Sequence, residues 1–548
     1  MTLQSIGQNA LERSESETVG TSIRVTLFLT VVAAAATFNS FRYALKIKFG
    51  PIDDHEIFKF LGSQRGIRWF DIPNILWNKT EIGKWGTSPR YRPSYYTIRV
   101  LETKMFGDNP VLWYGLRIGL VAVVIFLLTS VALQLANLRQ PKLKALCGVI
   151  SILTFLSLNA WRDIILRLGP SEFYLSVGYA LFLYLLLLNI QKPKSTTLVA
   201  LLVSLIVVVG SKENGISLLF PFLLLLLYLV CNQAVPKKIA YFSGLFSVVF
   251  VAFIFLGLNK AISRTGADVY GNQRSLAESV QLAVDYIKTS DFLRASSLLL
   301  VVLLCALMHR NRHGINSKIQ IVAPMFAGFF VLQIVFEHVF YKGNFPVLRY
   351  TLVTEISKTL LLLMAVFSAI GLIVDVVSKL TFKTEVACLA LLVLLFPTTY
   401  SKYDNSVTSN KKVALDNAET TSAYQKKIET IVNALDGNYS SVVIQLNNIW
   451  DYEPASAVIR YLQFYGRNPI FFLNLQIPSV QPGNESALLA QLTEYERYGS
   501  ELANVTPGPS EFGNVKPRPS ELGNNNFCVV FYGASGLPDV CRVSYDAS

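Results

Sequence analysis

Long apolar segments alternate with short polar connections along residues 23–399 of the chain. An α-helix needs about 20 predominantly apolar residues to cross the hydrocarbon core of a bilayer. Segments of roughly that length recur about eleven times, so the alternation predicts a polytopic α-helical membrane protein with about 11 transmembrane helices. The predicted spans cover residues 23–41, 111–136, 145–160, 173–190, 196–210, 215–231, 239–258, 295–309, 318–340, 351–377 and 384–399.

Two polar segments are much longer than the other connections. Residues 42–110 mix tryptophan, tyrosine and arginine, a composition typical of segments that lie at the level of the lipid headgroups. Residues 259–294 carry Leu276, Val280 and Val284 at helical spacing, which predicts a second surface-lying helix. Both segments are expected to be outer loops of a transmembrane domain that covers residues 23–399, after a short cytoplasmic tail at residues 1–22.

The composition changes at about residue 400. Residues 400–548 are rich in Asn, Ser, Thr, Gln and Gly, and their short apolar runs predict a small extracytoplasmic α/β domain. A ten-residue unit recurs three times near residues 500–524 and is interpreted as a surface loop or spacer. The predicted strands are residues 441–446, 470–475 and 527–532, and the predicted helices are residues 421–435 and 455–465.

Composition supports the membrane class. Hydrophobic residues make up 52% and charged residues 16% of the 548 positions, which no soluble core could accommodate. The net charge of +13 is compatible in sign with nucleic-acid binding, but the basic residues lie between apolar runs and do not gather in one patch. Nucleic acid is therefore not an expected partner.

The basic residues instead predict the orientation of the chain. Lys and Arg in short loops concentrate on the cytoplasmic side of a membrane. Every second connection contains Lys or Arg and no Asp or Glu, so these connections are expected in the cytoplasm and the two long loops and the tail outside. A multi-pass protein of the bacterial inner (plasma) membrane fits this pattern. The five basic connections are residues 137–144, 191–195, 232–238, 309–318 and 378–383.

Cysteine usage agrees with that orientation. Cys147, Cys231, Cys305 and Cys388 lie in or beside apolar spans, whereas Cys528 and Cys541 lie in the tail. A pair confined to the segment assigned to an oxidising compartment predicts a disulfide that closes a short loop, with two free thiols as the alternative.

An acidic cluster follows the first predicted span. Asp53 and Asp54 are adjacent, and His55 and Glu56 follow them directly. Two neighbouring carboxylates repel each other, so one can titrate high and accept a proton as a general base. The alternative interpretation is an acidic pair that is simply solvated near the headgroups.

Cations occur at the outer ends of later spans. Lys212 lies beside Glu213 in a short turn, and Arg349 precedes Tyr350. A phosphate leaving group needs fixed positive charge, which Lys212 and Arg349 would supply. As alternatives, Lys212 and Glu213 form a pair that staples a hairpin, and Arg349 is a snorkelling anchor.

A second charged group lies between the third and fourth predicted spans. Arg162, Asp163 and Arg167 are interpreted as an interfacial ion pair. The outer compartment lacks nucleotide cofactors, so an enzyme that transfers sugars there would use a donor delivered by the membrane, such as a polyprenyl phosphate. Its hydroxyl acceptor would need a carboxylate to take the proton.

The layout resembles GT-C-type integral-membrane glycosyltransferases, in particular the protein O-mannosyltransferases and the lipid A aminoarabinose transferase. The resemblance rests on the Asp53-Asp54 pair after the first span, the two long outer loops, the Lys212-Glu213 turn and the late Arg349-Tyr350 pair, and it covers roughly residues 20–400. It implies a GT-C-like fold and transfer of a hexosyl-type sugar from a lipid-phosphate donor, with inversion.

The resemblance also implies roles for individual residues. Asp53 or Asp54 would be the catalytic base, and Lys212 and Arg349 would bind the donor phosphate, followed by Arg92 and Arg117. The mannosyltransferases typically have acid-acid-x-His or an aromatic equivalent, whereas here His55 follows the pair directly and Glu56 takes the next place. This departure leaves the subfamily, the acceptor and any metal requirement open. The supporting residues are His55, Glu56, Arg162, Asp163, Glu213 and Tyr350.

The expected partners are a polyprenyl-phosphate sugar donor, membrane lipids and a glycan, lipid or protein acceptor. No metal site is predicted and no cofactor is certain, with a divalent metal left open. A polysaccharide polymerase or ligase would share these partners. A transporter or flippase of lipid-linked glycans is the other alternative, but it would be expected to carry charges deep inside its spans, and few are present.

Overall fold

The structure is a computed structural model. It describes residues 23–64, 66–88, 90–138, 140–265, 276–313, 319–341, 347–377, 384–435, 441–446, 452–467, 470–475, 506–507, 527–532 and 538–539.

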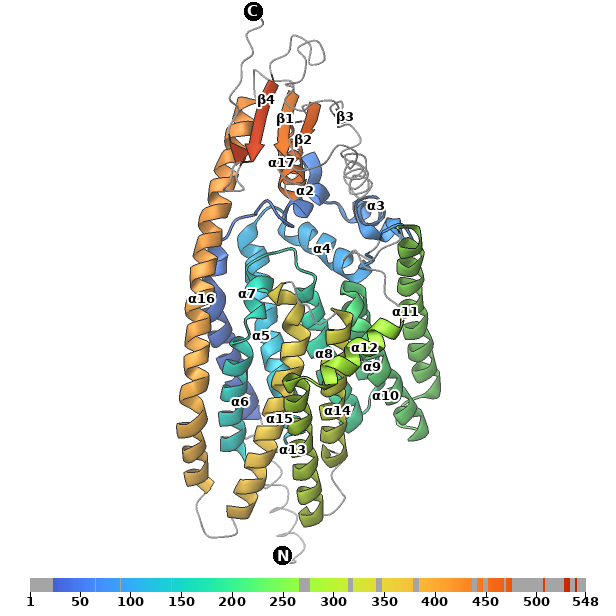
Figure 1. Ribbon diagram of the computed structural model, residues 1–548, viewed down its shortest axis with the longest axis vertical. Helices are drawn as coiled ribbons and strands as arrows, with labels where there is room; N and C mark the ends of the chain where they lie inside the picture. Colours follow the sequence, from blue (N-terminus) through green and yellow to red (C-terminus); the bar gives the residue numbers. More distant parts are fainter. Residues whose placement is uncertain are drawn as a thin grey trace, which may run out of the picture.

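A bundle of long helices forms the body of the molecule (Figure 1). Eight helices of the described residues are long and apolar enough to cross a membrane, so the chain is a multi-pass membrane protein. Of the other three predicted spans, residues 196–210 form a shorter apolar helix, and residues 145–160 overlap the 16-residue helix Pro141–Leu156. The last forms the start of a much longer helix. The bundle comprises the helix over residues 23–41, α5 (Pro110–Leu135), α6 (Pro141–Leu156), α8 (Glu172–Gln191), α9 (Ser195–Ser211), α10 (Leu219–Cys231), α11 (Lys237–Thr265), α13 (Ser290–His313), α14 (Ile319–Phe340), α15 (Leu352–Val377) and α16 (Thr384–Ala434).

Different structural elements lie at the two ends of the bundle. The last turns of α5, α13 and α15 and the first turn of α6 meet around one cavity, at the lower end in Figure 1. These helix ends flank three of the basic connections. Short helices and a β-sheet cover the opposite end, so the acidic cluster and the basic connections are separated by the length of the bundle.

The first long loop folds into a series of short helices. Pro93 and Pro110 stand at the starts of α4 and α5, where a missing backbone N–H costs nothing. The elements are η1 (Arg42–Lys46), α2 (His55–Leu61), η2 (Gly62–Gln64), η3 (Trp69–Asp71), α3 (Ile72–Lys79), η4 (Glu81–Lys84) and α4 (Pro93–Phe106).

Four more short elements lie between the long helices. The predicted surface helix of the second loop is α12 (Leu276–Ile287), which leaves Val280 and Val284 exposed. Its Tyr286 ring stacks on His338 of α14, with the ring centroids 4.1 Å apart. The other three are α7 (Ala160–Ile165), η5 (Glu213–Leu218) and η6 (Leu348–Thr351).

The helix α16 differs from the sequence prediction. A span at residues 384–399 and a separate helix from residue 421 were expected, but α16 is continuous over 51 residues. Residues 400–420 contain neither glycine nor proline, and Tyr403, Asn410, Ala414 and Thr421 are buried at helical spacing. Packing of that one face therefore keeps a polar stretch helical and joins the bundle to the tail.

The tail contains a five-stranded sheet at the end of α16 (Figure 1). Three strands coincide with the predicted stretches, and β1 pairs in parallel with β2 and β4, with Val443 opposite Phe472 and Val529. The helix α17 (Tyr452–Phe464) connects β1 to β2 and contacts α2, where the Phe58 and Tyr461 rings are 4.0 Å apart. The strand order is β3 (Thr506–Pro507), β2 (Ile470–Leu475), β1 (Ser441–Leu446), β4 (Phe527–Tyr532) and β5 (Pro538–Asp539).

Three predictions fall where the structure gives no description. The short cytoplasmic tail predicted at residues 1–22 lies outside the described residues. Cys541 lies outside the described residues, and so does the disulfide predicted between it and Cys528. Most of the repeat near residues 500–524 also lies outside them.

Candidate active site

A tight turn before α2 separates the two adjacent acids. The Gly50 N–H donates to Asp54 Oδ2 at 2.8 Å, and Asp53 adopts a φ of 65°, in the left-handed region that Asp tolerates better than most residues. The neighbouring carboxylates consequently point into different surroundings. The Asp53 side chain is 33% exposed, whereas Asp54 is 4% exposed.

Asp54 is an internal carboxyl group. Burial raises its pKa from 3.8 to about 6, while the nearby Arg99 opposes that rise. The guanidinium of Arg99 is fully buried over the Trp113 ring, 4.6 Å from its centroid, and has no hydrogen-bond partner among the described residues. Asp54 and Arg99 therefore compensate each other's charge beneath the turn that carries Asp53.

His55 and Glu56 are the first two residues of α2, and their side chains point toward other parts of the protein. Burial and the neighbouring Arg460 and Lys59 hold the pKa of His55 well below its usual value, so the imidazole is neutral at pH 7. Glu56 accepts hydrogen bonds from the Tyr95 and Tyr96 hydroxyls at 3.4 and 3.2 Å. Glu56 therefore stabilises the packing of α2 against α4.

A chain of ion pairs leads from Asp53 into the bundle. Arg167 lies 3.5 Å from Asp53 and 3.8 Å from Asp163, the residue one turn before it. Asp163 in turn forms an ion pair with the Arg349 guanidinium at 3.6 Å and accepts a hydrogen bond from the Arg349 backbone N–H at 3.4 Å. Asp53 can approach Arg167 because it packs directly on Gly169, where a Cβ would lie 1.9 Å from the Asp53 Cβ.

Lys212 continues the chain inside the bundle. Its ammonium forms a buried ion pair with Glu172, the first residue of α8, and lies 3.9 Å from the centroid of the Tyr350 ring. Glu172 also interacts electrostatically with Arg349. The partner of Lys212 is thus Glu172 and not the adjacent Glu213, which is half-buried at the start of η5.

We call these six residues the polar network. It consists of Asp53, Arg167, Asp163, Arg349, Glu172 and Lys212.

A buried carboxylate borders the polar network. Glu337 of α14 is fully buried and accepts hydrogen bonds from Asn214 at 3.0 Å and from Gln333 at 2.9 Å. Asn214 belongs to η5, two residues after Lys212, so Glu337 holds the turn from which the Lys212 side chain extends. Glu337 was not among the site residues predicted from the sequence.

The other arginines proposed from the sequence have different surroundings. Arg92 pairs with Glu81 at 2.7 Å, and its guanidinium lies 5.1 Å from the centroid of the Tyr95 ring. Arg117 is fully buried over the Phe173 ring and donates to three backbone carbonyls of residues 164–168. It therefore holds the segment that carries Arg167. Arg162 donates to the Ser409 hydroxyl of α16 at 2.7 Å.

The structure thus brings Asp53, Asp163, Lys212 and Arg349 together and leaves Arg92 and Arg162 outside the polar network. Two of its members, Arg167 and Glu172, were not among the site residues predicted from the sequence. Their signal was faint: Arg167 follows Asp163 by four residues, and Glu172 is a lone charge at the start of a span. Among the described residues, no group of three or more His, Cys, Asp or Glu side chains is placed to hold a metal ion.

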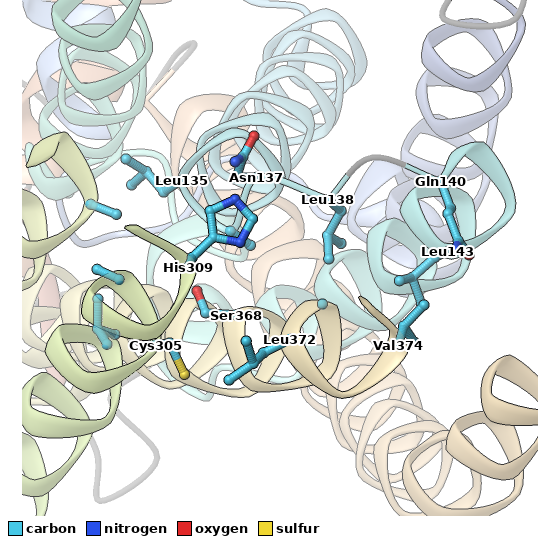
Figure 2. A pocket seen from close by; sticks show the side chains of 15 residues that line it. Leu135, Asn137, Leu138, Gln140, Leu143, Cys305, His309, Ser368, Leu372 and Val374 are labelled. Carbon is cyan, nitrogen blue, oxygen red and sulfur yellow. The ribbon is translucent and has the colours of Figure 1, made fainter. Parts of the chain in front are cut away.

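The cavity between α5, α13 and α15 lies at the opposite end from the polar network. Figure 2 shows Asn137, His309 and Ser368 among its mostly apolar lining residues. Its volume of about 60 Å³ has room for a few water molecules. It is too small to hold a sugar.

Comparison with known proteins gives a likeness in structure. No protein-family model and no curated protein matches the chain. The chain is similar to ArnT from Cupriavidus metallidurans in the apo state, with 15% identity, coverage of 89% of each chain and a TM-score of 0.42. It is also similar to the same protein bound to undecaprenyl phosphate, with 14% identity, coverage of 88% of this chain and 89% of that chain, and a TM-score of 0.43. ArnT is the lipid A aminoarabinose transferase, one of the comparisons suggested by the sequence.

Proposed function

We propose that the chain is a membrane glycosyltransferase that moves a sugar from a polyprenyl-phosphate-linked donor to an acceptor on the extracytoplasmic face. The observation that carries the proposal is the polar network, in which an accessible carboxylate lies next to a series of fixed cations. A carboxylate can take the proton of an acceptor hydroxyl, and fixed cations can stabilise a phosphate leaving group.

Asp53 is the better candidate for the base. An acceptor hydroxyl must reach the base, and the Asp53 carboxylate is accessible whereas that of Asp54 is buried and bonded to Gly50. Asp54 then positions Asp53 by holding the turn. In the proposed reaction the acceptor oxygen attacks the anomeric carbon, the bond from that carbon to the phosphate oxygen breaks, and the proton passes to Asp53. One displacement of this kind inverts the anomeric configuration.

Three cations are candidates for the donor phosphate. Arg349 and Lys212 were proposed from the sequence, and the ion pairs add Arg167. Arg117 is assigned a positioning role, since its guanidinium donates to the backbone of residues 164–168. Selection of the sugar, and of a glycan, lipid or protein as the acceptor, depends on parts of the site other than these contacts.

Sugar transfer by purified variants tests the proposal. Wild type, Asp53→Asn and Asp54→Asn are each supplied with a panel of polyprenyl-phosphate sugars and candidate acceptors. We expect Asp53→Asn to lower turnover by about 10²- to 10⁴-fold, the usual contribution of a general base, and Asp54→Asn to lower it less.

Asp71→Asn is the matched control, because Asp71 is in the same outer loop and pairs with the exposed Arg68 at 3.0 Å. It should leave turnover unchanged. Normal turnover in Asp53→Asn would remove the proposed base. If wild type moved a lipid-linked glycan across a vesicle bilayer without transferring sugar, the flippase alternative would replace the proposal.

A further inference from the structure

Each cation of the polar network already has a carboxylate partner. Lys212 pairs with Glu172, Arg349 with Asp163, and Arg167 with both Asp163 and Asp53. The three positive and three negative charges balance. A donor phosphate brings additional negative charge, so it must compete with at least one of these carboxylates for its cation.

The pairs differ in accessibility. The Lys212 and Glu172 side chains are 6% and 5% exposed, whereas the Arg167 side chain is 35% exposed and its partner Asp53 is similarly open. The contacts of Arg167, at 3.5 and 3.8 Å, are longer than that of Lys212 and similar to the 3.6 Å contact of Arg349, whose side chain is less exposed, at 20%. An ion pair that is exposed and loosely held is weak, and Arg167 is therefore the cation that an arriving phosphate takes most readily.

The backbone around Arg167 is fixed while its side chain can move. The buried Arg117 guanidinium donates to the carbonyls of Ile164, Arg167 and Leu168, and Asn417 donates to the Leu166 carbonyl at 3.2 Å. A change of partner at Arg167 thus needs only a rotation of its side chain.

We propose that the donor phosphate takes Arg167 away from Asp53, so that one guanidinium restrains the base in the empty site and binds the donor in the filled site. This inference rests on the proposed function and adds an order of events to it. The Arg167 guanidinium lies 3.5 Å from the Asp53 carboxylate and so occupies an oxygen that an acceptor hydroxyl would need to reach. When the donor phosphate takes Arg167, that oxygen is free for the acceptor hydroxyl, which is therefore activated after donor binding.

Binding of a polyprenyl phosphate without a sugar tests the competition. The dissociation constant is measured by calorimetry for detergent-solubilised wild type, Asp53→Asn, Arg167→Gln and the double variant. Asp53→Asn should bind about three- to fivefold more tightly, because the phosphate no longer competes with a carboxylate. Arg167→Gln should bind more weakly, and in its background Asp53→Asn should have no further effect.

The controls test separately whether the effect depends on the phosphate group and on the Asp53–Arg167 ion pair. Asp71→Asn, which frees an arginine in the same loop, should leave the dissociation constant unchanged. Polyprenol without phosphate should show no difference between wild type and Asp53→Asn. Arg167→Lys, which keeps the charge, should retain part of the affinity if Arg167→Gln does not fold.

The outcomes separate this inference from the proposed function. If wild type binds polyprenyl phosphate but Asp53→Asn binds it equally or less tightly, the competition is refuted while a phosphate-dependent donor remains supported. Tighter binding in Asp53→Asn that persists in the Arg167→Gln background also refutes it. Absence of polyprenyl phosphate binding by wild type would overturn the proposed function and the inference together.

Discussion

Asp53 and Asp54 show how far the surroundings of adjacent residues can diverge. The turn that places Asp53 at a φ of 65° exposes one carboxylate to solvent and the Arg167 guanidinium, and buries the other against Gly50 and Arg99. The identical side chains therefore take different parts, Asp53 as the proposed base and Asp54 as the group that holds the turn.

Gly169 is the residue that permits the approach of Asp53 to Arg167. In Gly169→Ala the new Cβ would lie 2.2 Å from the Asp53 Cγ, so the carboxylate must shift away. We expect sugar transfer to fall by about 10- to 100-fold, the usual effect of displacing a reacting group by about 1 Å. The measurement is turnover of the purified variant with a saturating donor.

Gly115→Ala is the matched control, since a Cβ at Gly115 meets no atom within 4 Å. It should retain wild-type turnover. Equal activity in the two variants would show that the packing of Asp53 on residue 169 has no effect on sugar transfer.

At the scale of elements, α16 supports two of the segments that carry the polar network. The Ser409 hydroxyl accepts from Arg162, the Asn417 amide donates to the Leu166 carbonyl at 3.2 Å, and the Thr421 hydroxyl accepts from the Lys48 N–H at 3.0 Å. Spacings of eight and four residues place the three side chains on one face of the helix. This helix therefore positions the turn of Asp53 and the segment of Arg167 relative to each other.

Thr421→Val tests this role with a side chain of nearly the same shape. It leaves the Lys48 N–H without its acceptor, which should cost about 1–3 kcal/mol and lower both the melting temperature and sugar transfer. Thr420→Val is the neighbouring control, because the Thr420 hydroxyl is exposed and bonds to its own helix at the Asp416 carbonyl. A similar loss in both variants would indicate a general effect on α16.

At the scale of the whole molecule, the polar network and the basic connections occupy opposite ends of the bundle. Figure 1 shows the sheet, α2 and α4 at one end, and the ends of α13 and α15 at the other. If the basic connections are cytoplasmic, the polar network faces the compartment in which a lipid-linked donor is expected.

Cysteine labelling tests this orientation. Lys237→Cys and Asp108→Cys place a thiol at an exposed position on opposite ends of the bundle, in a chain whose native cysteines are replaced by alanine. A membrane-impermeant maleimide should modify residue 108 in right-side-out vesicles and residue 237 in inverted vesicles. The reverse pattern would place the polar network in the cytoplasm and contradict a polyprenyl-linked reaction on the outer face.

The sequence by itself determined the features that depend on local patterning. The length of the apolar runs predicts membrane helices, because each span must be apolar along its own length. The short apolar runs at Ser441–Leu446 and Ile470–Leu475 likewise predict strands that the structure contains. The sequence also shows that Asp53 and Asp54 follow the first span, and that Lys212 and Arg349 are charges at the outer ends of later spans.

Only the tertiary structure decided which charges meet. Lys212 pairs with Glu172, 40 residues away, although Glu213 is its neighbour in the chain, and Asp53 reaches Arg167 across 114 residues. Such pairs form where helices pack side by side, because a charge buried in that packing is costly unless an opposite charge meets it. The pattern of residues along the chain does not show which helices are adjacent in the fold. The charged residues were therefore predictable as a set, and their partners were not.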